Sequence, residues 1–256
     1  MDSQTFFETL DDLFAKNQIK EAGEYLEQSL LSVREAKDIS LELSVLNEMM
    51  GYYRSTNQKE KGLKSVEEGL TLIRENGLME HPAVATMWIN MGTTLCHFNR
   101  VDEAEICYQN AEIFLKDIPT GALTMASLYN NTSAVFVKTK RFKEARDRYK
   151  KALDTLDTIN NEQELWEDLL FNRIVTWLNI LVLNQVEIRE TDEGNELYIK
   201  ELTEDSENII KQIKEVLGNE TFQETSSFAY ALKKCMLCFE NLGLKEEKIR
   251  IEEMKK

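Results

Sequence analysis

The chain repeats a pattern of bulky and small apolar positions with a period of 40 to 42 residues. The bulky residues that mark this period are Phe6, Leu46, Trp88, Tyr129 and Phe171. Further apolar residues follow each of them at intervals of three or four, which is the spacing of one face of a helix. A regular period of this length predicts a stack of similar helical units.

Short polar segments with a common layout separate the helices within each unit. They begin at positions 17, 57, 99 and 140, with asparagine at the first three and lysine at the fourth. Asparagine tolerates the left-handed backbone that ends a helix, so each segment predicts a tight turn between two helices. Small residues recur five positions after each start and again seven positions later, and they predict close approach of two helix backbones: Ala22, Ser29, Gly62, Gly69, Ala104, Ala111, Ala145 and Ala152.

The clearest unit resembles the tetratricopeptide repeat. It runs from Trp88 through Gly92, Ala104 and Tyr108 to Ala111, and this order of large and small residues is similar to that of the family. The period resembles the longer repeat of kinesin light chain-like proteins. The resemblance implies an all-α fold, a right-handed superhelix, or solenoid, of about six helix pairs.

We expect one solenoid over residues 1–256, with approximate repeats 1–38, 39–80, 81–120, 121–161, 162–219 and 220–256. The fifth repeat departs from the pattern, because the distance from Phe171 to Leu232 is 61 residues, about 20 more than one period. A long acidic loop is expected there, from Glu187 to Asn195. The charged last helix, from Lys245 to Lys256, is expected to cap the stack.

Composition restricts the classes of function. The net charge is −15, with 46 acidic and 31 basic side chains, and such a field repels phosphate backbones and argues against nucleic acid as a partner. The longest apolar stretch, residues 175–183, is interrupted by Asn179, so no membrane span is expected. The amino terminus lacks the pattern of a secretory signal, and the four cysteines are too few for a disulfide scaffold, so a cytoplasmic location is expected.

No catalytic motif is evident in the sequence. It has no phosphate-binding glycine loop and only two histidines, His81 and His97. Cys235 and Cys238 have the spacing of half a zinc site, but no second pair of ligands lies nearby, and core packing explains them better. We therefore expect a non-enzymatic protein without a cofactor or a metal.

The resemblance also implies where a ligand would bind. In this family the first helices of successive repeats line a concave groove, and the residues two positions after the bulky mark point into it. The candidate groove residues here are Glu48, Asn90, Asn131 and Arg173, together with Asn47, Asn130 and Asn172 one position earlier. Side-chain amides carry a donor and an acceptor, so they can pair with the backbone of an extended peptide. In an alternative interpretation, these asparagines join neighbouring helices and fix the stack.

Cations are scarce among these positions. Arg173 and Lys138 are the obvious groups to meet a carboxylate in the groove. Chaperone-binding members of the family carry a lysine-rich clamp, whereas the matching positions here hold small polar residues such as Ser44 and Thr86. A receptor for chaperone tails is therefore disfavoured.

The segment 138–151 is locally basic. It begins with Lys138, ends with Lys151, and holds eight basic and two acidic residues, a charge of +6. It can be a solvated helix face, which is the usual role of a charge run. Alternatively, it can dock on the acidic loop near Asp192 of a second copy and form a homo-oligomer.

The sequence thus favours a scaffold that binds a protein or an extended peptide in the groove of a solenoid. Two alternatives remain open at this point. One is a regulator that senses a signalling peptide, and the other is a structural component that assembles with itself.

Overall fold

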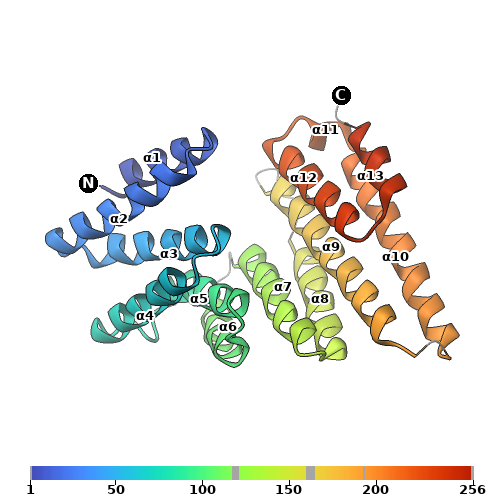
Figure 1. The fold of residues 1–256 in the computed structure, drawn as a ribbon, viewed down its shortest axis with the longest axis horizontal. Helices are drawn as coiled ribbons and strands as arrows, with labels where there is room; N and C mark the ends of the chain where they lie inside the picture. Colours follow the sequence, from blue (N-terminus) through green and yellow to red (C-terminus); the bar gives the residue numbers. More distant parts are fainter. Residues whose placement is uncertain (1, 117–120, 160–164, 193, 255–256) are drawn as a thin grey trace. The chain divides into compact units, whose positions relative to one another are not determined.

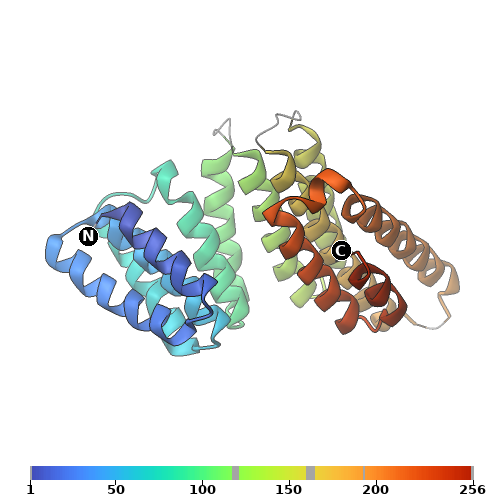
Figure 2. The ribbon, with the colours of Figure 1, turned by 90° about the horizontal axis from the view of Figure 1, so that it is seen from above.

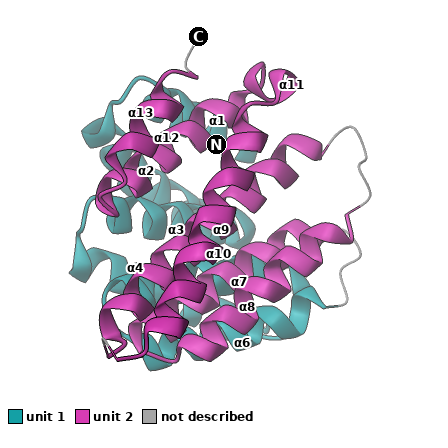
Figure 3. Ribbon diagram, turned by 90° about the vertical axis from the view of Figure 1, so that its right-hand side faces the viewer, with its two compact units in different colours: residues 1–118 teal, residues 119–256 magenta. Residues whose placement is uncertain are grey.

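The computed structural model describes residues 2–116, 121–159, 165–192 and 194–254. Over these segments the chain forms thirteen α-helices and one short 3-10 helix, and no strand (Figure 1). They belong to two compact units, residues 1–118 and 119–256 (Figure 3). The expected all-α fold is confirmed.

Unit 1 consists of three helix pairs. The pairs are α1 (Ser3–Ala15) with α2 (Ile19–Ala36), α3 (Ile39–Ser55) with α4 (Lys59–Glu75), and α5 (Ala85–His97) with α6 (Val101–Leu115). A 3-10 turn, η1 (Pro82–Val84), leads into α5. The two helices of each pair contact each other (Figure 2), and the first helices α3 and α5 also contact each other. The pairs of this unit therefore stack as a solenoid.

Unit 2 also consists of three pairs. They are α7 (Ala122–Lys138) with α8 (Phe142–Asp157), α9 (Trp166–Glu190) with α10 (Glu196–Leu217), and α12 (Ser226–Asn241) with α13 (Lys245–Glu252). The one-turn helix α11 (Glu220–Gln223) precedes the last pair. The first helix α9 contacts both α7 and α12, so these pairs stack in the same way.

The four predicted turns are confirmed at the level of the backbone. Asn17, Asn57, Asn99 and Lys140 all have positive φ angles, between 54° and 65°. After each of them, the next amide donates to a carbonyl five residues back, as Gln18 does to Leu13 at 2.9 Å and Arg100 to Leu95 at 2.8 Å. This bond satisfies a carbonyl that the helix end would leave unpaired.

The small positions lie where helices meet. Ala22, Ala104, Ala111, Ala145 and Ala152 are fully buried. At Gly92 an added Cβ would lie 2.7 Å from the Tyr108 ring, so the absence of a side chain lets α5 and α6 approach closely. The interpretation of these positions as helix contacts is confirmed.

The carboxyl-terminal half departs from the sequence-based expectation. Helix α9 continues to Glu190, so the expected loop from Glu187 is wrong over its first four residues. The added length lies in α9 and α10, which have 25 and 22 residues, and in α11. The helix stays ordered there because Glu187 is buried and paired with Arg146 of α8. The final helix ends at Glu252 rather than continuing to the terminus.

The expected end of the third repeat at position 120, the expected boundary at 161–162, and position 193 of the expected loop lie outside the described residues. The six helix pairs fall within the six expected ranges. The continuous right-handed solenoid over the whole chain stays a prediction.

Helix α9 is long and apolar enough to cross a membrane, judged by length and composition alone. Of the described residues, only this helix passes that test. A core helix of a soluble protein has the same properties, and α9 contacts α7, α8, α10 and α12. The helix is therefore weak evidence for a membrane span.

Candidate functional site

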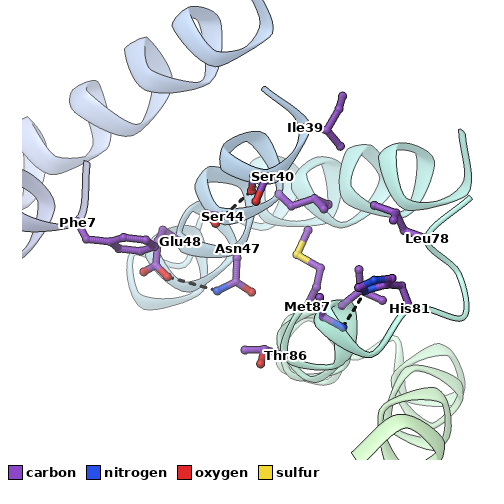
Figure 4. A pocket seen from close by; sticks show the side chains of 13 residues that line it. Phe7, Ile39, Ser40, Ser44, Asn47, Glu48, Leu78, His81, Thr86 and Met87 are labelled. Carbon is purple, nitrogen blue, oxygen red and sulfur yellow. Dashed lines mark hydrogen bonds between the residues drawn. The ribbon is translucent and has the colours of Figure 1, made fainter. Parts of the chain in front are cut away.

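A pocket of about 480 Å³ lies in unit 1, between α1, α3 and the segment that leads into α5 (Figure 4). Its apolar lining is formed by Phe7, Ile39, Leu43, Leu78, Ala83, Val84 and Met87. Its polar lining is formed by Ser40, Ser44, Asn47, Glu48, His81 and Thr86. A volume of this size, apolar walls and a few polar groups are typical of ligand sites.

Helix α3 positions the polar side of the pocket. Ser40, Ser44 and Glu48 are spaced by four residues and therefore lie on one face of the helix. The side chain of Asp38 caps the helix and accepts from the Leu41 amide at 3.0 Å, so this face begins at a fixed place. The Ser44 hydroxyl donates to the Ser40 carbonyl at 3.2 Å, which leaves the hydroxyl oxygen able to accept a further bond.

Two predicted groove asparagines connect neighbouring first helices. The Asn90 amide of α5 donates to the Asn47 amide oxygen of α3 at 2.7 Å. Asn47 in turn donates to the Glu48 carboxylate at 3.3 Å. The structure thus brings Asn47, Glu48 and Asn90 together in one hydrogen-bonded chain that reaches the pocket.

Glu48 is the charged group of the pocket. Burial raises the pKa of its carboxyl above the usual value of 4.5. The hydrogen bond from Asn47 lowers this pKa, the like charge of Asp11 raises it, and the charge of Arg54 lowers it. The net direction is upward, because the hydrogen bond and the distant cation do not replace the water that the carboxylate loses.

Arg54 is a residue of this surface that the sequence interpretation missed. It lies on α3, seven residues after Asn47, and donates to the Thr94 hydroxyl of α5 at 3.0 Å. Burial lowers the pKa of its guanidinium, and it has no carboxylate within ion-pair distance in the described part of the chain. Arg54 lies two helical turns after Asn47, and this spacing in the sequence indicates that both residues lie on the same face of α3.

The asparagines of unit 2 also bond between first helices. Asn130 of α7 is buried and donates to the Thr176 hydroxyl of α9 at 2.8 Å. Asn172 of α9 accepts from the Ser127 hydroxyl of α7 at 3.2 Å and donates to the Asp168 carbonyl at 2.8 Å. These two amides hold α7 against α9.

The remaining candidates of unit 2 are not brought to one place. Asn131 is half-buried on α7, and its side chain forms no hydrogen bond to a described residue. Arg173 forms an ion pair with Asp157 of α8. Lys138 is the exposed last residue of α7.

The bonding of Asn47, Asn90, Asn130 and Asn172 is the arrangement expected if these amides fix the stack. Their use by a ligand stays a prediction. An amide with one occupied group retains a second donor or acceptor, so the two roles are compatible.

Several residues of the basic segment 138–151 are paired within their own unit. Lys140 contacts the Glu190 carboxylate at 2.7 Å. Arg146 pairs with Glu187, which is 3% exposed and also accepts from the Tyr198 hydroxyl at 2.8 Å. Two of the acidic residues that were expected in a loop, Glu187 and Glu190, therefore lie on α9 and pair inside the unit.

His81 and the cysteine pair Cys235 and Cys238 lie in surroundings that do not indicate catalysis or metal binding. His81 lies in an exposed turn, where its imidazole accepts from the Ala83 amide at 3.2 Å. Burial raises the pKa of the Cys235 thiol to about 12 and that of Cys238 to about 11, so neither is a thiolate at neutral pH. The described residues contain no group of three or more potential metal ligands.

Comparison with known proteins agrees with this architecture. A tetratricopeptide repeat model matches residues 83–158, which contain α5 to α8. The crystal structure of BtubC (BKLC) from P. vanneervenii is similar, with a TM-score of 0.63 and 18% sequence identity over 82% of this chain and 80% of that chain. At this identity the likeness concerns the fold alone. No curated protein matches the sequence.

Proposed function

We propose that the protein is a non-enzymatic scaffold that binds a protein, or an extended segment of one, in the pocket of unit 1. The observation that carries this proposal is the pocket between α1, α3 and α5, which combines apolar walls with Glu48 and small hydroxyl side chains. Tetratricopeptide repeats generally mediate contacts between proteins, and the matched segment includes α5.

We further propose that the segments outside 83–158 are divergent repeats of the long variant found in kinesin light chain-like proteins. The support is the period of 40 to 42 residues, which continues through the bulky marks at Phe6 and Leu46. A location in the cytoplasm is part of the same proposal.

The test of the binding function is a selection of random twelve-residue peptides on the full-length protein, followed by titration of the enriched peptides. Ser44→Trp fills the pocket, and among the described residues Ser44 bonds only to a carbonyl of its own helix. Ser32→Trp on α2 is the matched control, because Ser32 is exposed and outside the pocket.

We expect Ser44→Trp to weaken binding by more than tenfold and Ser32→Trp to leave it unchanged. Equal affinities of the native protein and Ser44→Trp, with both folded by circular dichroism, would reject the pocket as the binding site.

Self-assembly through the segment 138–151 has less support, because Lys140 and Arg146 already pair with α9 of their own unit. Light scattering at low and high salt tests it, since an assembly held by charges dissociates when salt screens them. A monomer at both salt concentrations would contradict self-assembly.

A further inference from the structure

We propose that the segment held in the unit 1 pocket carries an apolar side chain within three positions of a lysine or an arginine. This inference rests on the proposed function, and it specifies the chemistry of the ligand. The occupant is thus a basic and apolar stretch of polypeptide in an extended conformation.

The acidic end of the pocket lacks a cation. The Glu48 carboxylate receives one hydrogen bond, from Asn47, and has no ion pair with a described residue. Asp11 of α1 is close enough to act on Glu48 electrostatically and also has no ion pair within the described segments. A half-buried carboxylate with a like charge beside it gains most from a positive ligand group.

Arg54 does not supply this charge. Its guanidinium donates to Thr94, and it lies six residues beyond Glu48 on α3, which is about 9 Å along the helix. Gly51 separates them, and apart from its chain neighbours and the adjacent backbone of α3 no described atom lies within 4 Å of where its Cβ would be, so the surface is open there. The two carboxylates outnumber the one guanidinium that acts on Glu48 from a distance, and this imbalance favours a basic partner.

Unit 1 as a whole also carries a negative net charge. Residues 1–118 contain 21 acidic and 11 basic side chains, so 11 minus 21 gives a net charge of −10. A field of this sign attracts basic segments and repels acidic ones before contact. An acidic peptide that used Arg54 would have to approach past Glu48 and Asp11.

The opposite end of the pocket is mostly apolar. Figure 4 shows Leu78 on the side away from Glu48, with His81 beside it. The lining residues Ile39, Leu43 and Leu78 are half-buried. Figure 4 also shows Phe7 of α1 on the side of the pocket where Glu48 lies. An apolar ligand side chain that covers these groups removes their remaining surface from water.

One extended peptide can reach both ends. Leu43 and Glu48 are five residues apart, which is about 7.5 Å along the helix axis and about 140° around it, so their side chains leave α3 in different directions. Successive residues of an extended chain are about 3.3 Å apart, so three positions span about 10 Å. An extended segment can therefore place an apolar side chain near Leu43 and, within three positions of it, the long stem of a lysine or arginine near Glu48.

The test uses the peptides enriched from the random library on the full-length protein. We expect Leu, Ile, Val, Met or Phe at one position and Lys or Arg within three positions of it. Replacing that Lys or Arg in the best peptide by Gln is expected to weaken binding to the native protein by about tenfold.

Three protein variants locate the charge recognition. Glu48→Gln is expected to bind the best peptide about tenfold more weakly. Glu35→Gln is the matched control, because Glu35 is exposed on α2 and its substitution removes the same charge. Glu48→Lys is expected to prefer the peptide in which the basic residue is replaced by Glu.

The outcomes separate this inference from the proposed function. Enriched peptides that lose binding to Ser44→Trp, yet are neutral or acidic or bind Glu48→Gln as tightly as the native protein, would overturn the basic ligand and keep the pocket. Peptides that bind Ser44→Trp normally would reject the pocket itself. Failure to enrich any peptide would count against both.

Discussion

A carboxylate that ionises inside an apolar pocket reduces the stability of the fold that holds it. Glu48 is such a group, since burial raises the pKa of its carboxyl above 4.5. A raised pKa means that the folded state binds the proton more tightly than the unfolded state, so this residue's contribution to stability falls as the pH rises through that region.

We therefore expect Glu48→Gln to have a higher melting temperature than the native protein at pH 7. The difference should shrink as the pH falls toward 4, where both states hold the proton. Thermal unfolding at several pH values, followed by circular dichroism, measures this. An increase of equal size in Glu35→Gln would mean that the overall charge, and not the pocket, is responsible.

Close approach of α5 to α6 depends on the missing side chain at position 92. An added Cβ would lie 2.7 Å from Tyr108, whose ring is 2% exposed and whose hydroxyl donates to Thr93. We expect Gly92→Ala to lower the free energy of unfolding by about 1–3 kcal/mol, the usual cost of overpacking. Urea titration measures it.

Gly51→Ala is the matched control, because nothing lies within 4 Å of its Cβ position in α3. Alanine is the better helix former, so Gly51→Ala should raise stability by about 0.5–1 kcal/mol. Destabilisation by both substitutions would contradict the packing argument.

At the scale of elements, a polar network joins α8 to α9 and α10. Arg146 of α8 contacts both Glu187 and Asn184 of α9, and Asn184 donates to Asp205 of α10 at 2.8 Å. Asn184 and Glu187 are almost completely buried. The ion pair offsets much of the free energy that a buried carboxylate loses with its hydration. When the partner is removed, this loss destabilises the fold in full.

We expect Arg146→Met to cost about 3 kcal/mol, the low end for a broken buried pair because the arginine side chain is 35% exposed. The double variant Arg146→Met, Glu187→Leu should recover much of that loss. A double-mutant cycle of unfolding free energies measures the coupling. Additive effects of the two substitutions would show that the pair is not a unit.

Sequence alone located the elements well because the signals are local. The left-handed turns at Asn17, Asn57 and Asn99 and the buried small residues follow from short-range rules of backbone and size. The continuation of α9 to Glu190 was missed, because two charges that look like part of a loop are paired, Glu187 with Arg146 of α8 and Glu190 with Lys140 of the preceding turn. Such pairing depends on contacts between residues far apart in the chain.

The site was less predictable than the fold. Asn47, Glu48 and Asn90 were expected on the groove, and the structure brings them together, but the hydrogen bonds among them depend on which rotamers neighbouring helices allow. Leu78 and His81 line the pocket from the turn before α5, which no helical period describes. Arg54 lies outside the positions defined by the bulky marks.

At the scale of the whole molecule, the charge of −15 attracts any basic ligand, so the local role of Glu48 has to be separated from it. Salt distinguishes the effect of the net charge from that of Glu48, because the screening length falls from about 10 Å at 0.1 M to about 3 Å at 1 M. We expect the affinity for the best basic peptide to fall by about tenfold over this range in the native protein and in Glu35→Gln.

Glu48→Gln should bind the basic peptide more weakly than Glu35→Gln at both ends of that range. The reason is that the Glu48 carboxylate, which this variant lacks, lies within the screening length of the bound ligand. Fluorescence polarisation titrations at four salt concentrations measure these affinities. If the two glutamine variants bind equally at every concentration, the attraction comes from the diffuse field of the acidic chain, and the pocket selects its ligand by shape and apolar surface alone.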